Sequence, residues 1–316
     1  MKIGFLIKWP RGSIKSKGNV IGEELYANAM CRILKRMTDI ESCDLYAPNH
    51  MPGEPLDLMI HLNDTSPDPE MARKHIQYLQ TSYLEGADKA LEKFYERGFH
   101  GFAFVSKKLF QIHAEKGRPG IYLPLAADTE IFYPREINRK YAWDVSYIGN
   151  DIKEEERTLL YIYPGVNHSF GLYGNWKLPF KLKYWKYREY QRKFSKITKG
   201  KIPQEDVPVL FSSSKINLNC TTQDYVNWDT ISLRSFEILA CRGFLISDRV
   251  SIAEKDLEGC AVFTDGGKDL EEKLEYYLAR PDERGKIAQK GYQYVMENET
   301  IESRSGILLG YIRDII

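Results

Sequence analysis

Short apolar runs alternate with helical patterns along almost the whole chain, and this alternation limits the possible folds more than any other feature. In the first half of the sequence, apolar runs predict strands at 3–7, 43–47, 56–62, 76–80, 102–105 and 121–125. Helical patterns separate several of these runs, most clearly at 23–37, 86–97 and 107–116. Continuous apolar strands that alternate with helices are typical of buried parallel sheets. The first half of the chain therefore predicts an α/β domain.

The pattern breaks between residues 124 and 139, and a second series follows. Residues 123–134 are rich in turn-forming types and residues 134–140 are polar, so we expect a domain boundary near 135. Beyond it, the same criteria predict strands at 143–148, 169–173, 216–219, 244–247 and 261–263, and helices at 154–163, 207–213, 232–241, 268–279 and 282–297.

A chain of 316 residues is long enough for about two domains. We expect Rossmann-like, doubly wound domains at 1–135 and 136–300, and then a helix at 301–316 that can pack back on the first domain. Ligands of open α/β sheets bind at the carboxyl ends of the strands. The expected site is therefore a cleft where the strand ends of the two domains face each other.

Charge is distributed unevenly along the chain. The whole sequence has 45 Lys+Arg and 44 Asp+Glu, a net charge of +1, with 43% hydrophobic residues. These values exclude a disordered chain and a nucleic-acid binder whose entire surface is basic. Residues 176–201 nevertheless hold ten Lys/Arg and one acid, a net charge of +9, which leaves the remainder with 35 basic and 43 acidic residues, a net charge of −8.

Aromatic residues interleave with the basic ones in segment 176–201. They are Trp176, Phe180, Tyr184, Trp185, Tyr187, Tyr190 and Phe194. A basic aromatic helix can contact an anionic membrane surface, an anionic glycan or a nucleic acid. The alternative is an insert whose aromatic side chains pack inward while its lysines are solvated. Both interpretations stay open, and neither makes a nucleic acid an obligatory partner.

Two further features of the sequence bear on where in the cell the protein is expected. No run of about 18 apolar residues is present, and the apolar start of the chain is too short for a signal peptide, so we expect neither. The five cysteines show no Cys-x-x-Cys spacing and are Cys31, Cys43, Cys220, Cys241 and Cys260. A scattered, odd set predicts reduced core cysteines. We therefore expect a cytoplasmic protein, with peripheral contact at the inner membrane face as an option for segment 176–201.

The most informative stretch is 217–248. A strand is predicted to end at Asn219, and a helix to begin near Thr230 or Ser232, either of which suits an N-cap. Free N–H groups at the start of this helix would form an anion site, and Arg234 in its first turn could contact a phosphate. Glu237 lies one turn inside, where its carboxylate could accept hydrogen bonds from a ribose diol.

Asp229 and Glu237 form an acid-x7-acid pair just before Ala-Cys-Arg-Gly-Phe-Leu-Ile-Ser-Asp at 240–248, which resembles the donor-binding motif of group-1, GT-B-fold glycosyltransferases. The closest resemblance is to the branch that includes CgeB-like spore-maturation proteins. Supporting segments lie at 104–107, 123–134, 144–150 and 281–291. The resemblance covers about residues 99–300 and implies a GT-B fold, with two Rossmann-like domains facing across a cleft.

The resemblance also implies roles for individual residues. Glu237 would hold the donor ribose, and Asp229 would touch the hydroxyls of the transferred sugar. Backbone amides at Thr230, Ile231, Ser232, Leu233 and Arg234 would hold the diphosphate. The nucleotide pocket would be lined by Gly149, Asn150, Tyr173, Gly174 and Asn219. Such enzymes bind the diphosphate without a metal ion, and the chain lacks a clear Asp-x-Asp metal motif.

Two positions depart from the family pattern. The first acid of the pair is Asp229, where Glu is usual. No convincing Arg-x4-Lys phosphate pair follows Gly149, because the stretch from Lys153 to Arg157 is largely acidic. Asp229 could equally be a loop carboxylate without a role, and Arg234 an ordinary surface arginine.

The first half of the chain offers weaker candidates. A glycine loop with Gly18, Asn19 and Val20 follows the first strand and would face the donor phosphates or the acceptor, although it does not match Gly-x-Gly-x-x-Gly and could be a plain turn. His61 and Asp64 follow the third predicted strand, where either could act on the reacting groups. A structural role for His61 is the alternative. The remaining histidines lack metal-ligand spacing.

The sequence thus predicts a glycosyltransferase that moves a sugar from a nucleotide-sugar, such as a UDP- or GDP-sugar, to an acceptor hydroxyl. The acceptor, a glycan, protein or lipid, is left open. We expect no cofactor and no metal, with retention of configuration favoured by the paired acids. The alternatives are a GT-B-like module that binds a nucleotide or glycan without turnover, and a nucleic-acid binder acting through 176–201.

Overall fold

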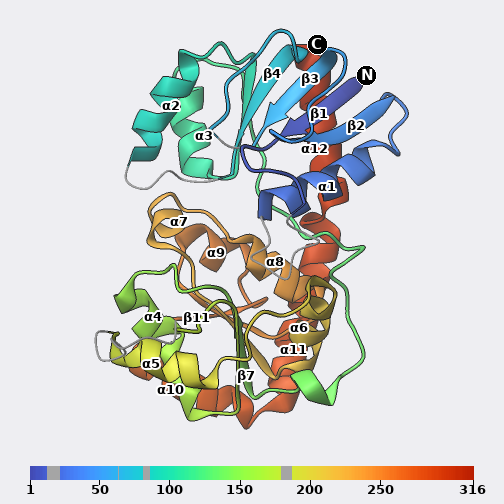
Figure 1. The fold of residues 1–316 in the computed structure, drawn as a ribbon. Coiled ribbons are helices and arrows are strands. Elements are labelled where there is room, and N and C mark those ends of the chain that lie inside the picture. The colour runs from blue at the N-terminus through green and yellow to red at the C-terminus, as the bar shows by residue number, and fades with distance from the viewer. Residues whose placement is uncertain (13–21, 63, 81–85, 179–186) are drawn as a thin grey trace. The chain divides into compact units, whose positions relative to one another are not determined.

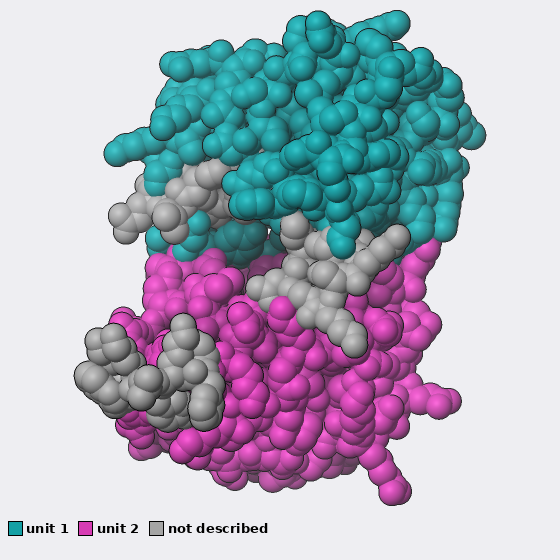
Figure 2. Space-filling model, viewed as in Figure 1, with its two compact units in different colours: residues 1–128, 224–231, 299–316 teal, residues 129–223, 232–298 magenta. Residues whose placement is uncertain are grey.

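The chain forms two compact units, each built on a parallel β-sheet (Figures 1 and 2). The structure is a computed structural model that describes residues 1–12, 22–62, 64–80, 86–178 and 187–316. Unit 1 comprises Met1–Asp128, Asp224–Ile231 and Glu299–Ile316, and unit 2 comprises Thr129–Gln223 and Ser232–Asn298. The predicted α/β class with two Rossmann-like sheets is confirmed.

Unit 1 holds a six-stranded sheet in the order β2-β1-β3-β4-β5-β6, with every described pair parallel. Its strands are β1 (Lys2–Leu6), β2 (Ser42–Tyr46), β3 (Leu56–His61), β4 (Ala72–Leu79), β5 (Gly101–Phe104) and β6 (Gly120–Tyr122). Its longer helices are α1 (Gly22–Leu34), α2 (Ala87–Tyr95), α3 (Lys107–Ala114) and α12 (Ile301–Ile315).

Unit 2 holds a five-stranded parallel sheet in the order β11-β10-β9-β7-β8. Its strands are β7 (Val145–Ile148), β8 (Phe170–Tyr173), β9 (Ile216–Asn219), β10 (Leu245–Asp248) and β11 (Val262–Thr264). Its α-helices are α4 (Glu155–Tyr161), α5 (Glu189–Ile197), α6 (Val207–Ser213), α8 (Leu233–Ala240), α9 (Ser251–Asp256), α10 (Gly267–Leu278) and α11 (Pro281–Asn298). Short 3₁₀ helices lie at Arg139–Tyr141, Tyr163–Asn167 and Gln204–Asp206, and α7 (Gln223–Asn227) spans the change from unit 2 to unit 1.

Both sheets share one strand order. In each, the first strand lies between the second and the third strand, so the chain turns one way after strand one and the other way after strand three. Such a switch point leaves a crevice at the carboxyl ends of the two central strands, and ligands of open α/β sheets bind there. The switch points are β1/β3 in unit 1 and β7/β9 in unit 2.

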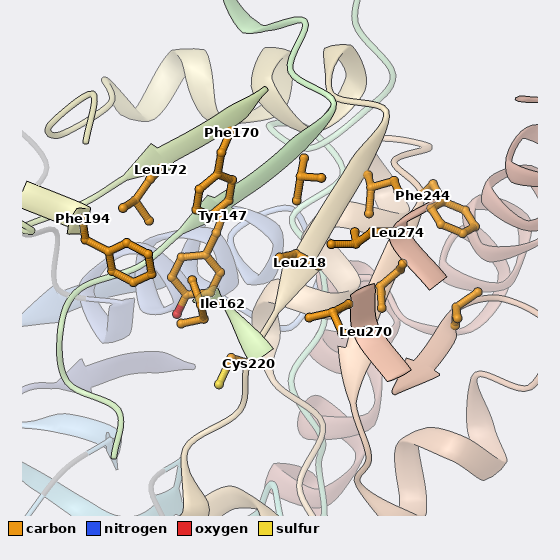
Figure 3. Close-up of a cluster of buried hydrophobic side chains, with 14 of the residues drawn as sticks. Tyr147, Ile162, Phe170, Leu172, Phe194, Leu218, Cys220, Phe244, Leu270 and Leu274 are labelled. Carbon is orange, nitrogen blue, oxygen red and sulfur yellow. The ribbon is translucent and has the colours of Figure 1, made fainter. Parts of the chain in front are cut away.

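The core of unit 2 includes aromatic side chains from the basic segment (Figure 3). Trp176, Tyr190 and Phe194 are 3%, 4% and 0% exposed and belong to the same cluster as Tyr147 and Phe170. Figure 3 shows Phe194 beside Tyr147 in this cluster. Burying an aromatic side chain contributes roughly 1.5–3 kcal/mol. The inward-packed interpretation of this segment therefore holds for these three residues, whereas Phe180, Tyr184 and Trp185 lie outside the described residues.

Strand β9 reads Ile-Asn-Leu-Asn, and all four residues are buried. Its asparagines are satisfied within the sheet, since the Asn217 amide donates to the Phe211 carbonyl at 3.1 Å and accepts from Ser146 Oγ at 2.8 Å. Buried polar groups need such partners. The pairing lets a half-polar sequence occupy a central strand.

The C-terminal helix α12 packs against α1 within unit 1 (Figure 1). The Tyr311 hydroxyl accepts a hydrogen bond from the Phe102 amide at 3.1 Å, and Arg304 Nε donates to the Pro124 carbonyl at 3.0 Å. Isolated bridging at Ala127 and Thr300 adds a backbone link at the start of this helix. These contacts place 299–316 in unit 1.

The observed elements differ from the predicted ones in a few places. Strand β4 begins at Ala72 rather than 76, because its first residues are polar, and β6 ends at Tyr122 rather than 125. Helices α7 and α9 are too short to give a recognisable period. Residues 224–231 group with unit 1, although the sequence assigned them to the second domain with the rest of 136–300. None of the helices in the described part of the chain is long and apolar enough to span a bilayer.

Candidate functional site

The ends of β7 and β8 are held together by two glycines. The Gly149 amide donates to the Tyr173 carbonyl at 3.0 Å. Gly174 has a φ of 129°, and a Cβ added to it would lie 1.9 Å from the Gly149 carbonyl oxygen. Only glycine fits such a position. The predicted residues Gly149 and Gly174 therefore lie side by side at the carboxyl edge of the unit 2 sheet.

The neighbouring candidates Asn150 and Tyr173 are occupied by local contacts. Asn150 Oδ1 accepts from the Asn175 amide at 2.9 Å. The Tyr173 hydroxyl accepts from Trp143 Nε1 at 3.2 Å, its side chain is 6% exposed, and burial raises the pKa of the phenol. The Tyr173 ring therefore belongs to the core, and its strand end reaches the edge through backbone.

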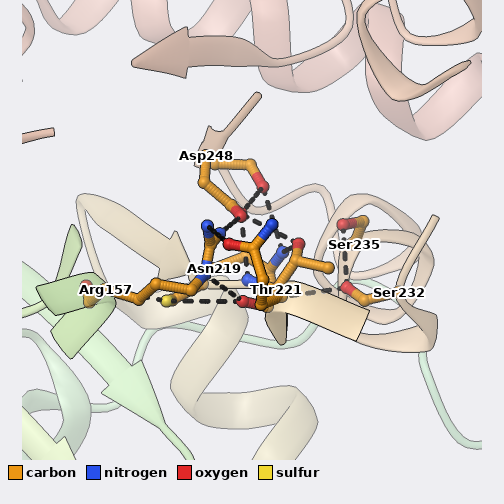
Figure 4. Close-up of polar contacts among 9 residues, drawn as sticks. Arg157, Asn219, Thr221, Ser232, Ser235 and Asp248 are labelled. Atoms are coloured by element: carbon orange, nitrogen blue, oxygen red, sulfur yellow. Dashed lines mark hydrogen bonds and ion pairs between the residues drawn. The ribbon is translucent and has the colours of Figure 1, made fainter. Parts of the chain in front are cut away.

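A buried ion pair organises the loop after β9 (Figure 4). Asp248, fully buried at the end of β10, accepts hydrogen bonds at Oδ1 from the Thr221 amide at 3.0 Å and the Thr221 hydroxyl at 2.9 Å. Its Oδ2 pairs with Arg157 Nη2, while Arg157 Nε donates to the Thr221 carbonyl at 2.9 Å. The Asp248 carboxylate thus binds the amide and hydroxyl of Thr221, and the Arg157 guanidinium binds its carbonyl.

Lys153 lies beside this ion pair. Its side chain is half-buried, and burial lowers the pKa of the ammonium group, partly offset by the charges of Cys220 and Asp248. Within the described part of the chain, no hydrogen-bond or ion-pair partner is found for its Nζ. A partly desolvated cation whose Nζ has no direct partner among the described residues is suited to bind an anion.

The charged residues from Lys153 to Arg157 lie in different surroundings. Glu154 and Glu156 are exposed, and Glu155 pairs with Arg188 at 2.5 Å. Arg157 pairs with Asp248, and the charge of Asp248 also acts on Lys153, whereas Glu154 and Glu156 are exposed to solvent. Counting charges along the chain does not reveal this, because α4 presents its faces in different directions.

Helix α8 begins at Ser232, whose backbone has the extended conformation of an N-cap. Its hydroxyl does not cap the helix. It donates to Asn219 Oδ1 at 3.2 Å, and Asn219 Nδ2 donates to Ser247 Oγ at 3.0 Å (Figure 4). Asn219 thus ties the helix start to β9 and β10. In the described residues no acceptor is found for the first-turn amides of Leu233 and Arg234, so they fit the predicted anion site.

The prediction for the amide of Thr230 is wrong. That N–H donates to the Tyr225 carbonyl at 2.9 Å inside the preceding turn, and Thr230 is 1% exposed. Ile231 is also buried, at 8% exposure. Of the predicted amides, those that begin α8 are the ones open to a ligand.

Arg234 and Glu237 contact each other on one face of α8. The guanidinium Nη1 lies 2.6 Å from Glu237 Oε2, and the two side chains are 31% and 9% exposed. The predicted partners were separate, a phosphate for Arg234 and a ribose for Glu237. In the structure the pair is preformed, and Arg234 orients the carboxylate that was predicted to accept from the ribose.

Residues 224–231 are anchored in unit 1 by several contacts. Trp228 is 8% exposed and packs with Leu79, Phe104 and Leu109, and Ser106 Oγ donates to its carbonyl at 2.6 Å. The Tyr225 hydroxyl donates to the Gln80 carbonyl at 2.6 Å. The predicted acid-x7-acid motif is therefore divided, with Asp229 in unit 1 and Glu237 in unit 2.

Asp229 itself has a φ of 53°, in the left-handed region. Asp and Asn tolerate this conformation better than most residues, and such strain costs on the order of 1 kcal/mol. A strained acid in an anchored loop is compatible with the predicted role and does not establish it.

The unit 1 candidates behave differently. His61 is fully buried, with Nδ1 2.7 Å from Thr65 Oγ1 and Nε2 3.0 Å from His75 Nδ1. Burial, followed by the charge of His75, lowers the pKa of His61 to about 3. The structure therefore favours the structural interpretation of His61 over a catalytic one.

Asp64 forms an ion pair with Arg97 and its side chain is 48% exposed. Gly18, Asn19 and Val20, predicted to contact phosphate or acceptor, lie outside the described residues.

Comparison with known proteins bears on the class of protein. Residues 157–310 match the family model described as glycosyl transferase-like. None of the curated protein sequences is significantly similar to the chain.

Solved structures resemble the whole chain. Sucrose-phosphate synthase from Thermosynechococcus elongatus superposes with a TM-score of 0.69 at 12% identity, over 99% of this chain and 98% of that one. Anabaena HepE in complex with UDP and glucose gives 0.64 at 11%, over 99% of both chains. T4 phage BGT in complex with UDP-glucose gives 0.61 at 14%, over 100% and 99%.

These likenesses define the fold. The chain has the GT-B fold, and residues 157–310 match the model of a glycosyl transferase-like family.

Proposed function

We propose that the protein transfers a sugar from a nucleotide-sugar to an acceptor hydroxyl, without a metal ion and with retention of configuration. The observation that carries this proposal is the gathering of anion-binding groups at the β7/β9 switch point. There, Lys153 lies at the same sheet edge as the amides of Leu233 and Arg234, and none of the three has a hydrogen-bond partner among the described residues. A diphosphate carries negative charge that can pair with the Lys153 ammonium, and oxygens that can accept hydrogen bonds from the α8 amides.

The fold and the neighbours support the choice of ligand. HepE and BGT are described in complex with UDP, glucose or UDP-glucose. In this chain, Gly149 and Gly174 let the ends of β7 and β8 approach each other closely, since a Cβ at Gly174 would meet the Gly149 carbonyl, and this shapes the sheet edge. We assign the donor to this edge of unit 2, and the resemblance of 281–291 supports a place beside the CgeB-like branch.

The residues would divide the work as follows. Lys153 and the α8 amides stabilise the negative charge that develops on the departing diphosphate. Glu237, oriented by Arg234, accepts hydrogen bonds from the ribose. The Arg157–Asp248 pair does not touch the donor; it holds the Thr221 loop in place beside it.

The test uses the full chain and a panel of UDP-, GDP- and dTDP-sugars. Calorimetry measures binding, and product analysis measures transfer and donor hydrolysis. We expect one nucleotide class to bind, and Lys153→Met to weaken that binding about tenfold, the value of one lost charged contact near 1.4 kcal/mol. The matched control is Lys268→Met, a solvated lysine of unit 2 that is 87% exposed.

Three results decide between the alternatives. Binding with turnover supports the transferase. Binding without transfer or hydrolysis across a broad acceptor set supports a non-catalytic module. No binding by any nucleotide-sugar contradicts the proposal, and a Lys153→Met variant with wild-type affinity removes Lys153 from the site.

The nucleic-acid alternative is weakened by the core of unit 2. Trp176, Tyr190 and Phe194 are buried and cannot stack on bases. Exposed lysines such as Lys193 and Lys196 remain on α5 and could still attract an anionic acceptor. Steep salt dependence of DNA or RNA binding would favour that alternative, and no binding at low salt would remove it.

A further inference from the structure

Two cysteines, twelve residues apart in the sequence, meet in the core of unit 1. Cys31 lies on α1 and Cys43 on β2, and their sulfur atoms are 3.0 Å apart. That separation exceeds a disulfide bond by only about 1 Å. The other three cysteines, Cys220, Cys241 and Cys260, all belong to unit 2.

We propose that Cys31 and Cys43 are a redox-convertible pair that a small-molecule disulfide of the glutathione type oxidises to an intramolecular disulfide. The Cys31 thiolate attacks the small disulfide, which forms a mixed disulfide and releases one small thiolate. The Cys43 thiolate then attacks the Cys31 sulfur and releases the second. Two cysteine thiols and one small disulfide become one protein disulfide and two small thiols, so atoms, protons and electrons balance.

The surrounding packing holds the two sulfurs near each other. Cys43 pairs in register with Ile3 of the adjacent strand, and Cys31 is one turn from Leu34, which is fully buried on α1. Both elements are fixed by the core, so bond formation needs a small side-chain movement.

Burial sets the rate and the order of attack. Cys31 is 5% exposed and Cys43 is fully buried, so Cys31 is the first to meet an oxidant. The hydrogen bond with Cys43, and then burial, raise the pKa of the Cys31 thiol. Because the thiolate is the reacting form, we expect slow oxidation that accelerates at alkaline pH.

The disulfide would link the edge strand β2 covalently to α1, and the chain between Cys31 and Cys43 would become a closed loop. Cross-links of this kind stabilise chiefly by restricting the unfolded chain. The candidate donor site is in unit 2 and shares no residue with the pair. Oxidation is therefore expected to raise thermal stability and leave nucleotide-sugar binding unchanged.

The experiment incubates the folded, full-length protein with glutathione disulfide at neutral and alkaline pH. Free thiols are counted after denaturation, and peptide mass mapping locates the link. We expect the loss of two of the five thiols, a single Cys31–Cys43 cross-linked peptide, and a thermal midpoint several degrees higher that reverses with reductant.

Variants sharpen the result. Cys31→Ala and Cys43→Ala should each abolish both the link and the upward shift, whereas Cys260→Ala, in unit 2, should retain both. The proposal is overturned if Cys31 and Cys43 stay reduced in the folded protein, or if they link only after unfolding. The mapping of the wild-type protein decides this even if a variant does not fold.

Discussion

The two switch points share one strand order but differ in charge: an uncharged histidine ends the third strand of unit 1, whereas an ion pair lies beside the third strand of unit 2. In unit 1 the third strand ends at His61, a neutral residue enclosed by Thr65 and His75. In unit 2 the third strand ends at Asn219, which leads into a loop held by the Arg157–Asp248 ion pair. Topology fixes where a crevice forms, and the residues at the strand ends decide whether it can attract an anion.

The comparison also explains why the buried charge of Asp248 is tolerated in unit 2. Asp248 is fully buried but is met by the Thr221 amide and hydroxyl, Ser247 Oγ and a guanidinium. A buried charge with such partners is stable, and the same charge without them is not. Unit 1 has no comparable network among its described residues at β3, where burial lowers the pKa of both His61 and His75.

The largest effect is expected from breaking the unit 2 network. Asp248→Ala would leave Arg157 and the Thr221 donors without their acceptor, and loss of one partner of a buried ion pair costs about 3–5 kcal/mol. Urea unfolding measures the free energy. The control is the double variant Asp248→Leu with Arg157→Met, which removes both charges and should recover much of the loss. A single-variant loss under about 1 kcal/mol, the range of a surface pair, contradicts this account.

Much of the fold followed from the sequence, because the apolar runs of β1, β3 and β9 and the helical period of α8 are local signals. The site followed only in part. Nothing in the sequence shows that Asp248 meets Arg157, since the pairing depends on how α4 packs on the sheet.

Two further misses have the same physical origin. The Thr230 amide donates a hydrogen bond to the Tyr225 carbonyl within a turn. The composition of a segment does not show which amides form such bonds. Cys31 and Cys43 meet because α1 packs on β2, although their spacing matches no known pairing motif. The aromatic residues Tyr225 and Trp228 were the available signal that 224–231 is buried against other elements.

The next effect tests the neutral switch point of unit 1 by pH. The folded pKa of His61, about 3, lies below its ordinary value of 6.5, so folding favours the uncharged ring. Its contribution to stability is complete above pH 6.5 and is lost as the pH falls towards 3. From the size of the shift we expect a loss on the order of 3 kcal/mol at pH 4.

Unfolding free energies of wild type and His61→Gln, measured from pH 8 to pH 4, check this expectation. The variant should be less stable at pH 8 and should lose less on acidification than the wild type. Asp64→Asn, which alters an exposed ion pair nearby, is the control and should keep the wild-type slope. Parallel curves for wild type and His61→Gln would show that another group governs the acid sensitivity.

The smallest effect separates backbone strain from crowding, with one glycine from each unit. Gly12 in unit 1 and Gly174 in unit 2 have φ values of 123° and 129°, but a Cβ at Gly12 meets nothing within 4 Å, whereas one at Gly174 reaches the Gly149 carbonyl. Alanine at either position incurs the strain of a positive φ, about 1 kcal/mol. Gly174→Ala should cost about 1–3 kcal/mol more, the range for overpacking. Equal losses of unfolding free energy in urea would show that the ends of β7 and β8 can move apart freely. The close approach of these two strand ends would then not shape the edge where we place the donor.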